Sequence, residues 1–191
     1  YEKDHYRVWE YLNRNCENYP THELGPISKV LGINRGNRML SLIAFSSKAR
    51  GVEHYIETYH PDHYLKGKKF NQGDIVTTTI TCANGELIRL TLDTTLIRPF
   101  YSREFTVRGT KGMFEQQSNS AYFDGQKEFW SPVEYFDEYK NSAEKYKELL
   151  PPMWSEITQE QLDAGHGGMD YLEFRDFVDR LKAGREMPID V

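Results

Sequence analysis

The sequence of 191 residues lacks the features of several specialised protein classes. Its two cysteines, Cys16 and Cys82, fit no zinc-ligand spacing and are too few for a dense disulfide framework. Its most apolar run, MLSLIAF at residues 39–45, is far shorter than the roughly 20 residues that a membrane helix needs. These absences predict a soluble chain with no metal site and no membrane span.

The sequence also lacks the signals of a nucleic-acid or nucleotide site. With 24 Lys and Arg against 29 Asp and Glu, the net charge is -5 and no basic block stands out, so we exclude a nucleic-acid partner. Neither GxGxxG nor GxxxxGK occurs, the glycine motifs whose loops hold phosphate groups. Any dinucleotide cofactor is therefore expected to be bound mainly outside this chain.

Length and composition predict one domain spanning residues 1–191. A chain of this length with 38% hydrophobic and 14% aromatic residues can bury one sizeable core but hardly two. It opens inside a helix-like pattern, YEKDHYRVWEYL, without an initiator methionine, and it ends without a polar tail. We therefore expect it to be part of a longer protein.

Helical apolar spacing recurs toward both ends of the chain. The segments that show it are residues 4–16, 26–32, 131–150 and 168–184. In the first, Val8, Tyr11 and Leu12 share one face, and in the second Pro26 fits the first helical position, with Gly32 as the stop. In the last, the stripe expected to be buried consists of Phe174, Phe177, Val178 and Leu181.

The middle of the sequence predicts an antiparallel sheet. Two β-branched runs in residues 75–96 flank Asn84-Gly85, a pair that favours a type I′ hairpin turn. In the second run, apolar Ile88, Leu90 and Leu92 alternate with polar Arg89, Thr91 and Asp93. One face of this strand is therefore expected to pack and the other to be polar.

Further strands and one loop are predicted around this hairpin. Residues 39–45 predict a buried strand and residues 63–74 a solvated loop. Residues 103–109 and 113–118 are expected to extend the same sheet, and residues 121–125 to add a short edge. The predicted fold class is α+β, an open, mostly antiparallel β-sheet with helices packed on one face.

The stretch NYPTHELGP at residues 18–26 is the first candidate site. Tyr19 and His22 lie three residues apart around a proline that stiffens the chain. Tyrosine and histidine each donate and accept hydrogen bonds, and histidine titrates near neutrality, so the pair suits proton transfer or recognition of sugar hydroxyls. The structural alternative is that His22 caps the start of a helix while Tyr19 packs.

The stretch AGHGGMDYLEF at residues 164–174 is the second. Glycines around His166, just before a helix, allow the backbone to approach a ligand at the positive end of the helix dipole. We therefore take His166 as a candidate contact to an anionic or hydroxyl-rich ligand. The alternative, equally supported by the segment alone, is a tight turn that His166 caps.

Two other segments carry polar clusters. In residues 93–104, a strand breaks at Pro99 and presents Arg98, Tyr101, Ser102 and Arg103 at its end. Such loop positions commonly bind ligands, although a simple interruption between strands explains the pattern as well. The remaining cluster, His54, His60 and His63, fits no standard metal site, and we interpret these as surface histidines.

Five pieces of the sequence, taken in order, resemble the C-terminal half of the Gfo/Idh/MocA oxidoreductase family, and more closely its NAD-dependent branch, glycoside hydrolase family 109, the α-N-acetylgalactosaminidases. They are Arg7, YPTHELGPI with Leu31-Gly32, DTTLIRPFYSRE, RGTKGMFE and GHGGMDY. The resemblance covers nearly the whole chain. It implies an N-terminal Rossmann domain outside residues 1–191 that binds NAD, and an open sheet face that forms a homo-oligomer interface.

The resemblance also implies roles for individual residues. The positions of Arg7, Tyr19, His22 and Tyr101 line the sugar and nicotinamide site in this branch, with Tyr19 and Tyr101 toward the cofactor and His22 and Tyr19 in the chemistry. The implied mechanism oxidises the sugar at C3 with NAD, eliminates the group at C1, adds water and returns the hydride. Glycosidases of this kind need no carboxylate pair.

One position departs from the wider superfamily. Many of its dehydrogenases carry an acid four residues before the active-site histidine, where this chain has Asn18. A neutral amide cannot polarise the histidine as a carboxylate would, which favours the glycosidase over the alternative of an NAD(P)-dependent sugar or polyol dehydrogenase. A second alternative is a non-catalytic, sugar-binding or assembly domain.

Overall fold

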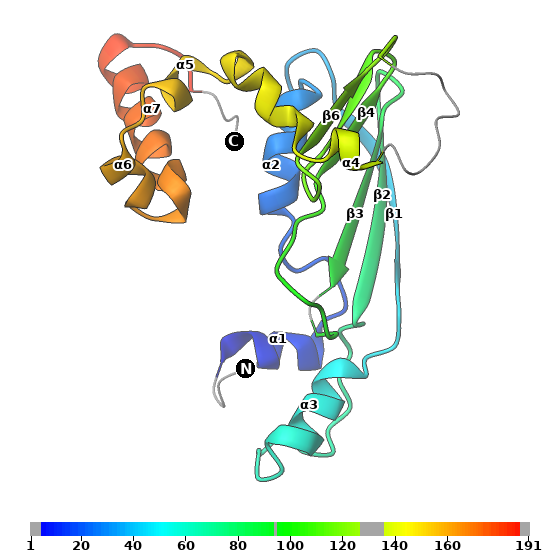
Figure 1. Cartoon of the computed structure of the whole chain (residues 1–191). Helices are drawn as coiled ribbons and strands as arrows, with labels where there is room; N and C mark the ends of the chain where they lie inside the picture. The colour runs from blue at the N-terminus through cyan, green and yellow to red at the C-terminus, as the bar shows by residue number, and fades with distance from the viewer. Residues whose placement is uncertain (1–4, 94, 127–135, 188–191) are drawn as a thin grey trace. The chain divides into compact units, whose positions relative to one another are not determined.

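The computed structural model describes residues 5–93, 95–126 and 136–187, and the chain divides into two compact units (Figure 1). The first comprises Tyr1–Tyr101 and the second Ser102–Val191. Each contains a three-stranded antiparallel sheet and helices, so the predicted α+β class with open antiparallel sheet is confirmed. The assignment of residues 1–191 to one domain of a longer protein stays a prediction.

The first sheet has the strand order β1 (Met39–Ser46), β2 (Ile75–Cys82), β3 (Leu87–Asp93). One face is covered by α2 (Thr21–Val30), which runs beside the sheet in Figure 1. The buried residues of this face are Ile80, Cys82, Ile88 and Leu90, and the side chains packed on them include Leu24, Ile27 and Leu31. The predicted alternation in β3 is confirmed, because Ile88 and Leu90 are buried while Arg89 and Thr91 are exposed.

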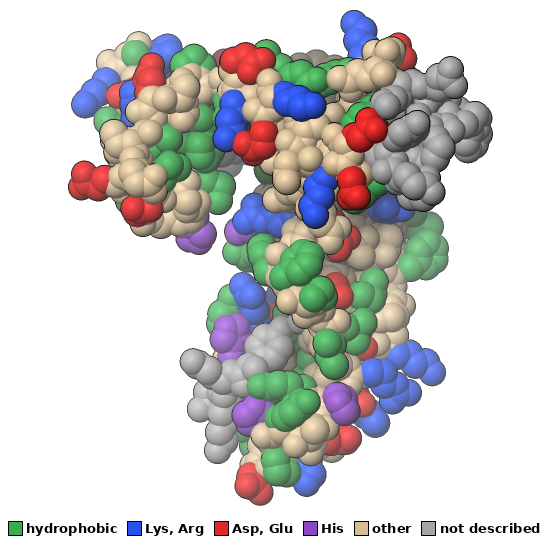
Figure 2. All heavy atoms as spheres, viewed as in Figure 1, with side chains coloured by type: hydrophobic (Ala, Val, Ile, Leu, Met, Phe, Trp, Pro, Cys, Tyr) green, Lys and Arg blue, Asp and Glu red, His purple; other side chains and the backbone are tan. Residues whose placement is uncertain are grey.

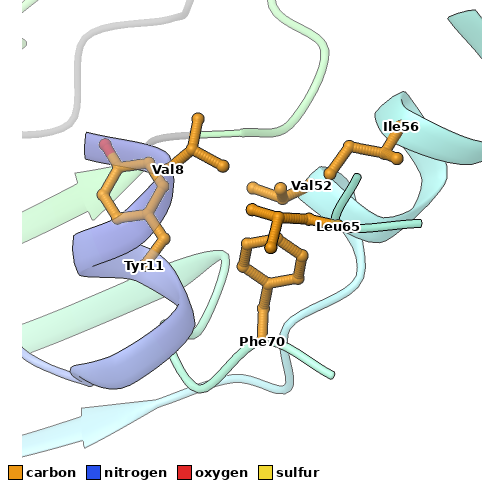
Figure 3. Close-up of a cluster of buried hydrophobic side chains, with 6 residues drawn as sticks. All are labelled: Val8, Tyr11, Val52, Ile56, Leu65 and Phe70. Carbon is orange, nitrogen blue, oxygen red and sulfur yellow. The ribbon is translucent and has the colours of Figure 1, made fainter. Parts of the chain in front are cut away.

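A second core cluster joins α1 (Tyr6–Asn13), α3 (Gly51–Tyr59) and the loop before β2 (Figure 3). Its buried members are Val8, Tyr11, Val52, Ile56, Leu65 and Phe70. The predicted inner face of residues 4–16 is therefore confirmed. The prediction of a solvated loop at residues 63–74 is wrong, because Leu65 and Phe70 supply apolar area that α1 and α3 alone would leave uncovered.

The strand predicted at residues 39–45 exists as β1, but it is not buried. It lies at the edge of its sheet, and most of its side chains are exposed. Its backbone pairs with β2, where for example Ile43 lies opposite Thr79. The apolar run therefore marks a surface left open within the described chain, and periodicity alone could not distinguish that from burial.

The hairpin between β2 and β3 forms as predicted, but its turn is of another type. The N–H of Gly85 donates to the carbonyl of Cys82, and the N–H of Cys82 donates to the carbonyl of Glu86. Gly85 has a φ of 96°, whereas Asn84 is not among the residues with positive φ. A type I′ turn needs positive φ at both centres, so the loop is instead a turn closed by a left-handed glycine, as in three-residue hairpins.

The helix predicted at residues 26–32 begins five residues earlier, at Thr21, and Pro26 lies inside α2. Its predicted stop is confirmed. Gly32 has a φ of 61°, and the N–H groups of Gly32 and Ile33 donate to the carbonyls of Lys29 and Ser28. This pair of bonds is the Schellman arrangement that glycine favours after a helix.

The second unit contains the sheet β4 (Thr106–Gly109), β5 (Gly112–Glu115), β6 (Ser120–Phe123) in that order. The prediction that these segments extend the first sheet is wrong, because they pair only with one another among the described residues. The predicted short edge is confirmed as β6. The hydroxyl of Ser142 bonds both the N–H and the carbonyl of Ala121 in β6, which ties the following helices to this edge.

Several helices follow this sheet, and all but the last are short. They are α4 (Phe136–Tyr139), the 3-10 helix η2 (Ser142–Leu149), α5 (Pro152–Ser155), α6 (Gln159–Asp163), the 3-10 turn η3 (His166–Gly168) and α7 (Met169–Ala183). The continuous helix predicted at residues 131–150 is therefore replaced by α4 and η2, with residues 131–135 outside the described residues. Asn141, between them, has a left-handed φ of 61° and interrupts the helix.

The long helix predicted at residues 168–184 is confirmed as α7, with Gly184 in a left-handed conformation at its end. Its predicted buried stripe is wrong. Leu172 is the buried residue of α7, while Phe174 and Leu181 are among the exposed large hydrophobic side chains. Among the described residues, no helix combines the length and the apolar character that crossing a membrane requires.

Candidate functional site

Three of the predicted site residues lie together in the first unit. The guanidinium carbon of Arg7, on α1, lies 5.0 Å from the centre of the Tyr19 ring. The ring centres of Tyr19 and His22 are 4.4 Å apart, and the Tyr19 hydroxyl oxygen lies 3.4 Å from Nε2 of His22. The helices α1 and α2 and their connection thus bring a cation, a phenol and an imidazole into one cluster.

The local sequence explains this geometry. Pro20 precedes the first residue of α2, and its ring fixes the backbone at a φ of -74°. Tyr19 and His22 are three residues apart, a spacing that places two side chains on the same side of a helical turn. The Tyr-Pro-Thr-His step therefore directs the phenol toward the imidazole before any ligand is present.

Arg7 carries the positive charge of the cluster. A hydrogen bond from its Nε to the Tyr6 hydroxyl, 3.1 Å long, is the main cause that raises the pKa of Arg7 above its usual value. Burial opposes this rise, and the electrostatic influence of Tyr11 and Tyr19 adds to it. A guanidinium over an aromatic ring is favourable, so Arg7 holds the Tyr19 ring while its remaining N–H groups can bind an oxygen-rich ligand.

Glu17 lies two residues before Tyr19 and was not among the predicted residues. One of its carboxylate oxygens, Oε2, is buried without a hydrogen-bond partner among the described residues. Burial is the main cause that raises the pKa of Glu17, the neighbouring Glu23 adds to the rise, and a hydrogen bond from the Tyr19 backbone opposes it. No spacing rule signals a half-buried acid in this connection, so the sequence could not identify it.

A buried glutamine beneath the same connection was also missed. Oε1 of Gln72 accepts hydrogen bonds from the Cys16 N–H at 3.2 Å and from Nδ2 of Asn18 at 2.6 Å. Its Nε2 donates to the carbonyls of Cys16 at 3.0 Å and Gly73 at 3.2 Å. Asn18 is therefore turned toward Gln72, in the loop that the sequence indicated as solvated.

Tyr101 lies in the segment after β3. Its side chain is exposed. Upstream, Nη1 of Arg98 donates to the carbonyl of Asp93 at 2.7 Å and lies 3.4 Å from its carboxylate, which folds the segment back onto the strand end. Ser102 and Arg103, predicted beside Tyr101, belong to the second unit.

His166 lies in the second unit, in η3 directly before α7. Its Nδ1 is 2.9 Å from both carboxylate oxygens of Asp170, one helical turn onward. The backbone of His166 has a φ of 43°, rare for a residue with a side chain. The side chain of His166 is exposed, and its partner is the Asp170 carboxylate and not a backbone N–H of the turn, so the pair fits either a ligand contact or a turn held by a side-chain pair.

The other histidines form no site. His54 and His60 are exposed, as predicted, but His63 is buried, and its Nδ1 accepts a hydrogen bond from the Leu65 N–H. The prediction of a surface position for His63 is therefore wrong, because the loop at residues 63–74 packs against the core and is not solvated as predicted. Within the described residues, no group of three potential ligands could hold a metal ion.

The chain matches, over residues 1–191, the family model described as glycosyl hydrolase 109, C-terminal domain. The chain belongs to glycoside hydrolase family 109. A family 109 protein of Stenotrophomonas maltophilia is 41% identical, with 97% of this chain aligned to 40% of that protein. A Tannerella forsythia protein named α-N-acetylgalactosaminidase is 37% identical, with 100% of this chain aligned to 39% of that protein.

A Shewanella oneidensis protein with the same name, α-N-acetylgalactosaminidase, is 34% identical over 97% of this chain and 40% of its own length. The chain thus spans about two fifths of the length of the curated relatives it matches. Membership of family 109 agrees with the resemblance that Arg7, the YPTH stretch and GHGGMDY indicated. The cluster of Arg7, Tyr19 and His22 is therefore a candidate active site within a family 109 fold.

Proposed function

We propose that this chain forms the substrate-binding and catalytic part of an NAD-dependent glycosidase that acts on α-N-acetylgalactosaminides. The observation that carries the proposal is the cluster of Arg7, Tyr19 and His22 in a chain of family 109. Two relatives bear the name of that activity. The cluster contains an acid/base pair and a cation, as chemistry on a polyhydroxylated ring requires.

Each residue has a proposed role. His22 transfers a proton to or from the reacting sugar hydroxyl, or holds that hydroxyl by a hydrogen bond, and the Tyr19 hydroxyl beside Nε2 shares the proton. Arg7 binds substrate oxygens with the N–H groups that Tyr6 leaves available. Tyr101 is proposed as a further substrate contact of the first unit, and His166 is proposed separately as a sugar contact of the second unit.

NAD, when bound, supplies the hydride acceptor that allows oxidation of the sugar at C3 and return of the hydride at the end of the cycle. Tyr19 is 44% exposed and Tyr101 71% exposed, so both side chains can contact a nicotinamide. The sequence contains no glycine motif for the phosphates. We therefore assign most of the NAD site to an N-terminal Rossmann domain outside residues 1–191.

A second copy of the chain is the proposed partner of the open sheet face. This face carries Ile43 and Phe45 on β1 and Leu87 on β3, whose side chains are all exposed. Between these two strands, β2 presents threonines at alternate positions on the same face. On the face seen in Figure 2, charged side chains of both signs are interspersed with hydrophobic ones. A homo-oligomer would cover the apolar positions.

The experiment is hydrolysis of an aryl α-N-acetylgalactosaminide by the full-length protein, followed at the NADH absorbance band. We expect release of the aglycone without net NADH, because the hydride returns to the sugar, and uptake of solvent deuterium at C2 of the product. Stoichiometric NADH would instead indicate a sugar or polyol dehydrogenase. Sugar binding without either product would indicate a non-catalytic domain.

A further inference from the structure

The side-chain amide of Gln72 has only one orientation that satisfies its neighbours. It is 3% exposed, so water cannot replace a lost partner. Its oxygen faces two donors, the Cys16 N–H and Nδ2 of Asn18, and its nitrogen faces two carbonyl oxygens, those of Cys16 and Gly73. A reversed amide would set donor against donor and acceptor against acceptor at all four contacts.

This fixed orientation of the Gln72 amide determines which type of side chain fits at position 18. The Gln72 oxygen lies 2.6 Å from Nδ2 of Asn18, so the side chain there must be a donor. A carboxylate has the shape of this amide but has no donor when ionised. It would place a negative oxygen against the oxygen of the buried Gln72 at a part-buried contact, and we expect this to cost more than leaving the position empty.

The same segment is bound on its other side. Oδ1 of Asn15 accepts a hydrogen bond from the Gly73 N–H at 3.1 Å, and Nδ2 of Asn15 donates to the Ser46 hydroxyl at 2.7 Å. The N–H groups of Asn71 and Gln72 both donate to the Tyr11 carbonyl. Residues 15–18 are thus held between the end of α1 and the loop before β2.

Tyr19 follows this held segment directly, and Pro20 then starts α2. No glycine lies between Asn18 and His22, and Pro20 restricts the backbone there, so we infer that the direction of the Tyr19 and His22 side chains depends on the hydrogen bonds at Cys16 and Asn18. A displacement of the order of 1 Å in such a support is enough to impair a catalytic group.

We propose that Gln72 is a positioning residue for the Tyr19–His22 pair, and that it requires an amide and excludes a carboxylate at position 18. The histidine then pairs with the Tyr19 hydroxyl, while the side chain of Asn18, four residues before it, donates to the side chain of Gln72. Only the kinetic part of this inference rests on the proposed function. The structural part concerns this chain alone.

The test compares Asn18→Asp, Asn18→Ala and Gln72→Leu in the full-length protein loaded with NAD. The control is Asn71→Asp, the same chemical change on an exposed side chain of the same loop. We expect Asn18→Asp and Gln72→Leu to lower kcat by about tenfold or more with KM changed less than kcat, because the reacting groups are misdirected. The isosteric Asn18→Asp should be more harmful than the truncation Asn18→Ala, and Asn71→Asp should stay within about twofold of wild type.

A second measurement, independent of activity, is hydrogen exchange of the backbone amides of residues 15–22. We expect faster exchange in Asn18→Asp and Gln72→Leu than in wild type and Asn71→Asp, with the rest of α2 still protected. If the wild type shows no glycosidase activity but this difference is present, the proposed function fails and the positioning role stands. Unchanged exchange, or an Asn18→Asp variant no worse than Asn18→Ala, would overturn the inference.

Discussion

The hydroxyl oxygen of Tyr19 lies 3.4 Å from Nε2 of His22, and either group can donate this hydrogen bond, depending on the tautomer of the imidazole. The neighbour of the imidazole is a hydroxyl that can both donate and accept a hydrogen bond, whereas an ionised carboxylate can only accept one. This contact is the basis for the first prediction.

We expect His22→Ala to lower kcat by about a hundredfold or more in the full-length enzyme, the usual effect of losing a general acid or base. Tyr19→Phe should act in the same direction with a smaller effect, because His22 keeps its position while its proton partner is lost. Steady-state kinetics on an aryl glycoside measures both. The control is the circular dichroism spectrum, which should not change.

One result would contradict a catalytic role for His22. Retention of kcat within about threefold in His22→Ala, a change below 1 kcal/mol in the barrier, would show that His22 acts only in the fold of α2. Arg7→Lys offers a comparison, since it keeps the charge but loses the planar fork that lies over the Tyr19 ring. It should raise KM more than it lowers kcat.

The chain of residues 1–191, expressed alone, should not bind NAD with micromolar affinity. Its sequence provides contacts to the nicotinamide end at most, and the adenine and phosphate groups supply most of the surface by which a Rossmann domain holds a dinucleotide. Isothermal titration calorimetry with NAD measures this directly. Heat consistent with micromolar binding would show that the cofactor site lies within this chain.

The sequence predicted correctly those structural features that depend on residues close to one another along the chain. The face of α1, the alternation along β3, the Gly32 stop and the extent of α7 all follow from spacing and backbone preference, and all are confirmed. The hairpin was predicted because β-branched runs flank Asn84-Gly85, although the turn type depended on how the two strands meet.

Burial, in contrast, depends on partners that the sequence does not name. Phe174 on α7 has helical core spacing and Ile43 on β1 lies in an apolar run, yet both are exposed. Gln72 and His63, from a polar loop, are buried because that loop closes over α1 and α3. The sequence predicted Tyr19 and His22 because they are near each other along the chain. It did not predict Gln72, whose hydrogen bond to Asn18 joins residues 54 positions apart.

Glu17 should make stability depend on pH. Burial raises the pKa of its carboxyl in the folded chain above the unfolded value, so the folded state binds the proton more tightly. Its contribution to stability is then fully present below the unfolded pKa and is lost as pH rises through the folded pKa. We therefore expect wild type to gain stability relative to Glu17→Gln as pH falls from 7 to 4.

The measurement is the urea midpoint of both proteins across that range, because the slope of their difference reports the differential proton binding. Glu144 serves as a comparison, since its pKa is lowered, first by hydrogen bonds from Lys147 and Asn119. Glu144→Gln should lose stability relative to wild type as pH rises, the opposite sign. A Glu17→Gln difference that is flat with pH would contradict the assignment.

The two glycines after His166 should differ in their tolerance of a side chain. A Cβ at Gly168 would lie 2.6 Å from Cδ1 of Ile157 and 3.2 Å from Cα of Leu162, whereas a Cβ at Gly167 meets nothing within 4 Å. Both have positive φ, so either alanine costs about 1 kcal/mol or more in backbone strain. Gly168→Ala should cost a further 1–3 kcal/mol or so from overpacking, measured by urea unfolding.

The last prediction concerns His166, whose Nδ1 is held by Asp170 at 2.9 Å. A carboxylate on Nδ1 favours the tautomer whose Nε2 is free to accept a hydrogen bond from a sugar hydroxyl. If His166 contacts substrate, His166→Ala should act partly through KM, and Asp170→Ala should follow it in direction. The matched control is Asp176→Ala, which removes the same kind of one-turn pair, to Arg180, farther along α7.

Kinetics and unfolding together decide between the two interpretations of the glycine-rich turn. A ligand contact requires His166→Ala and Asp170→Ala to lower kcat/KM while Asp176→Ala does not, at comparable losses of stability. If instead kcat/KM of His166→Ala stays within about threefold of wild type, well under 1 kcal/mol, the residue acts only in the fold. The Asp170 pair would then be a side-chain contact that holds the strained backbone of His166 before α7.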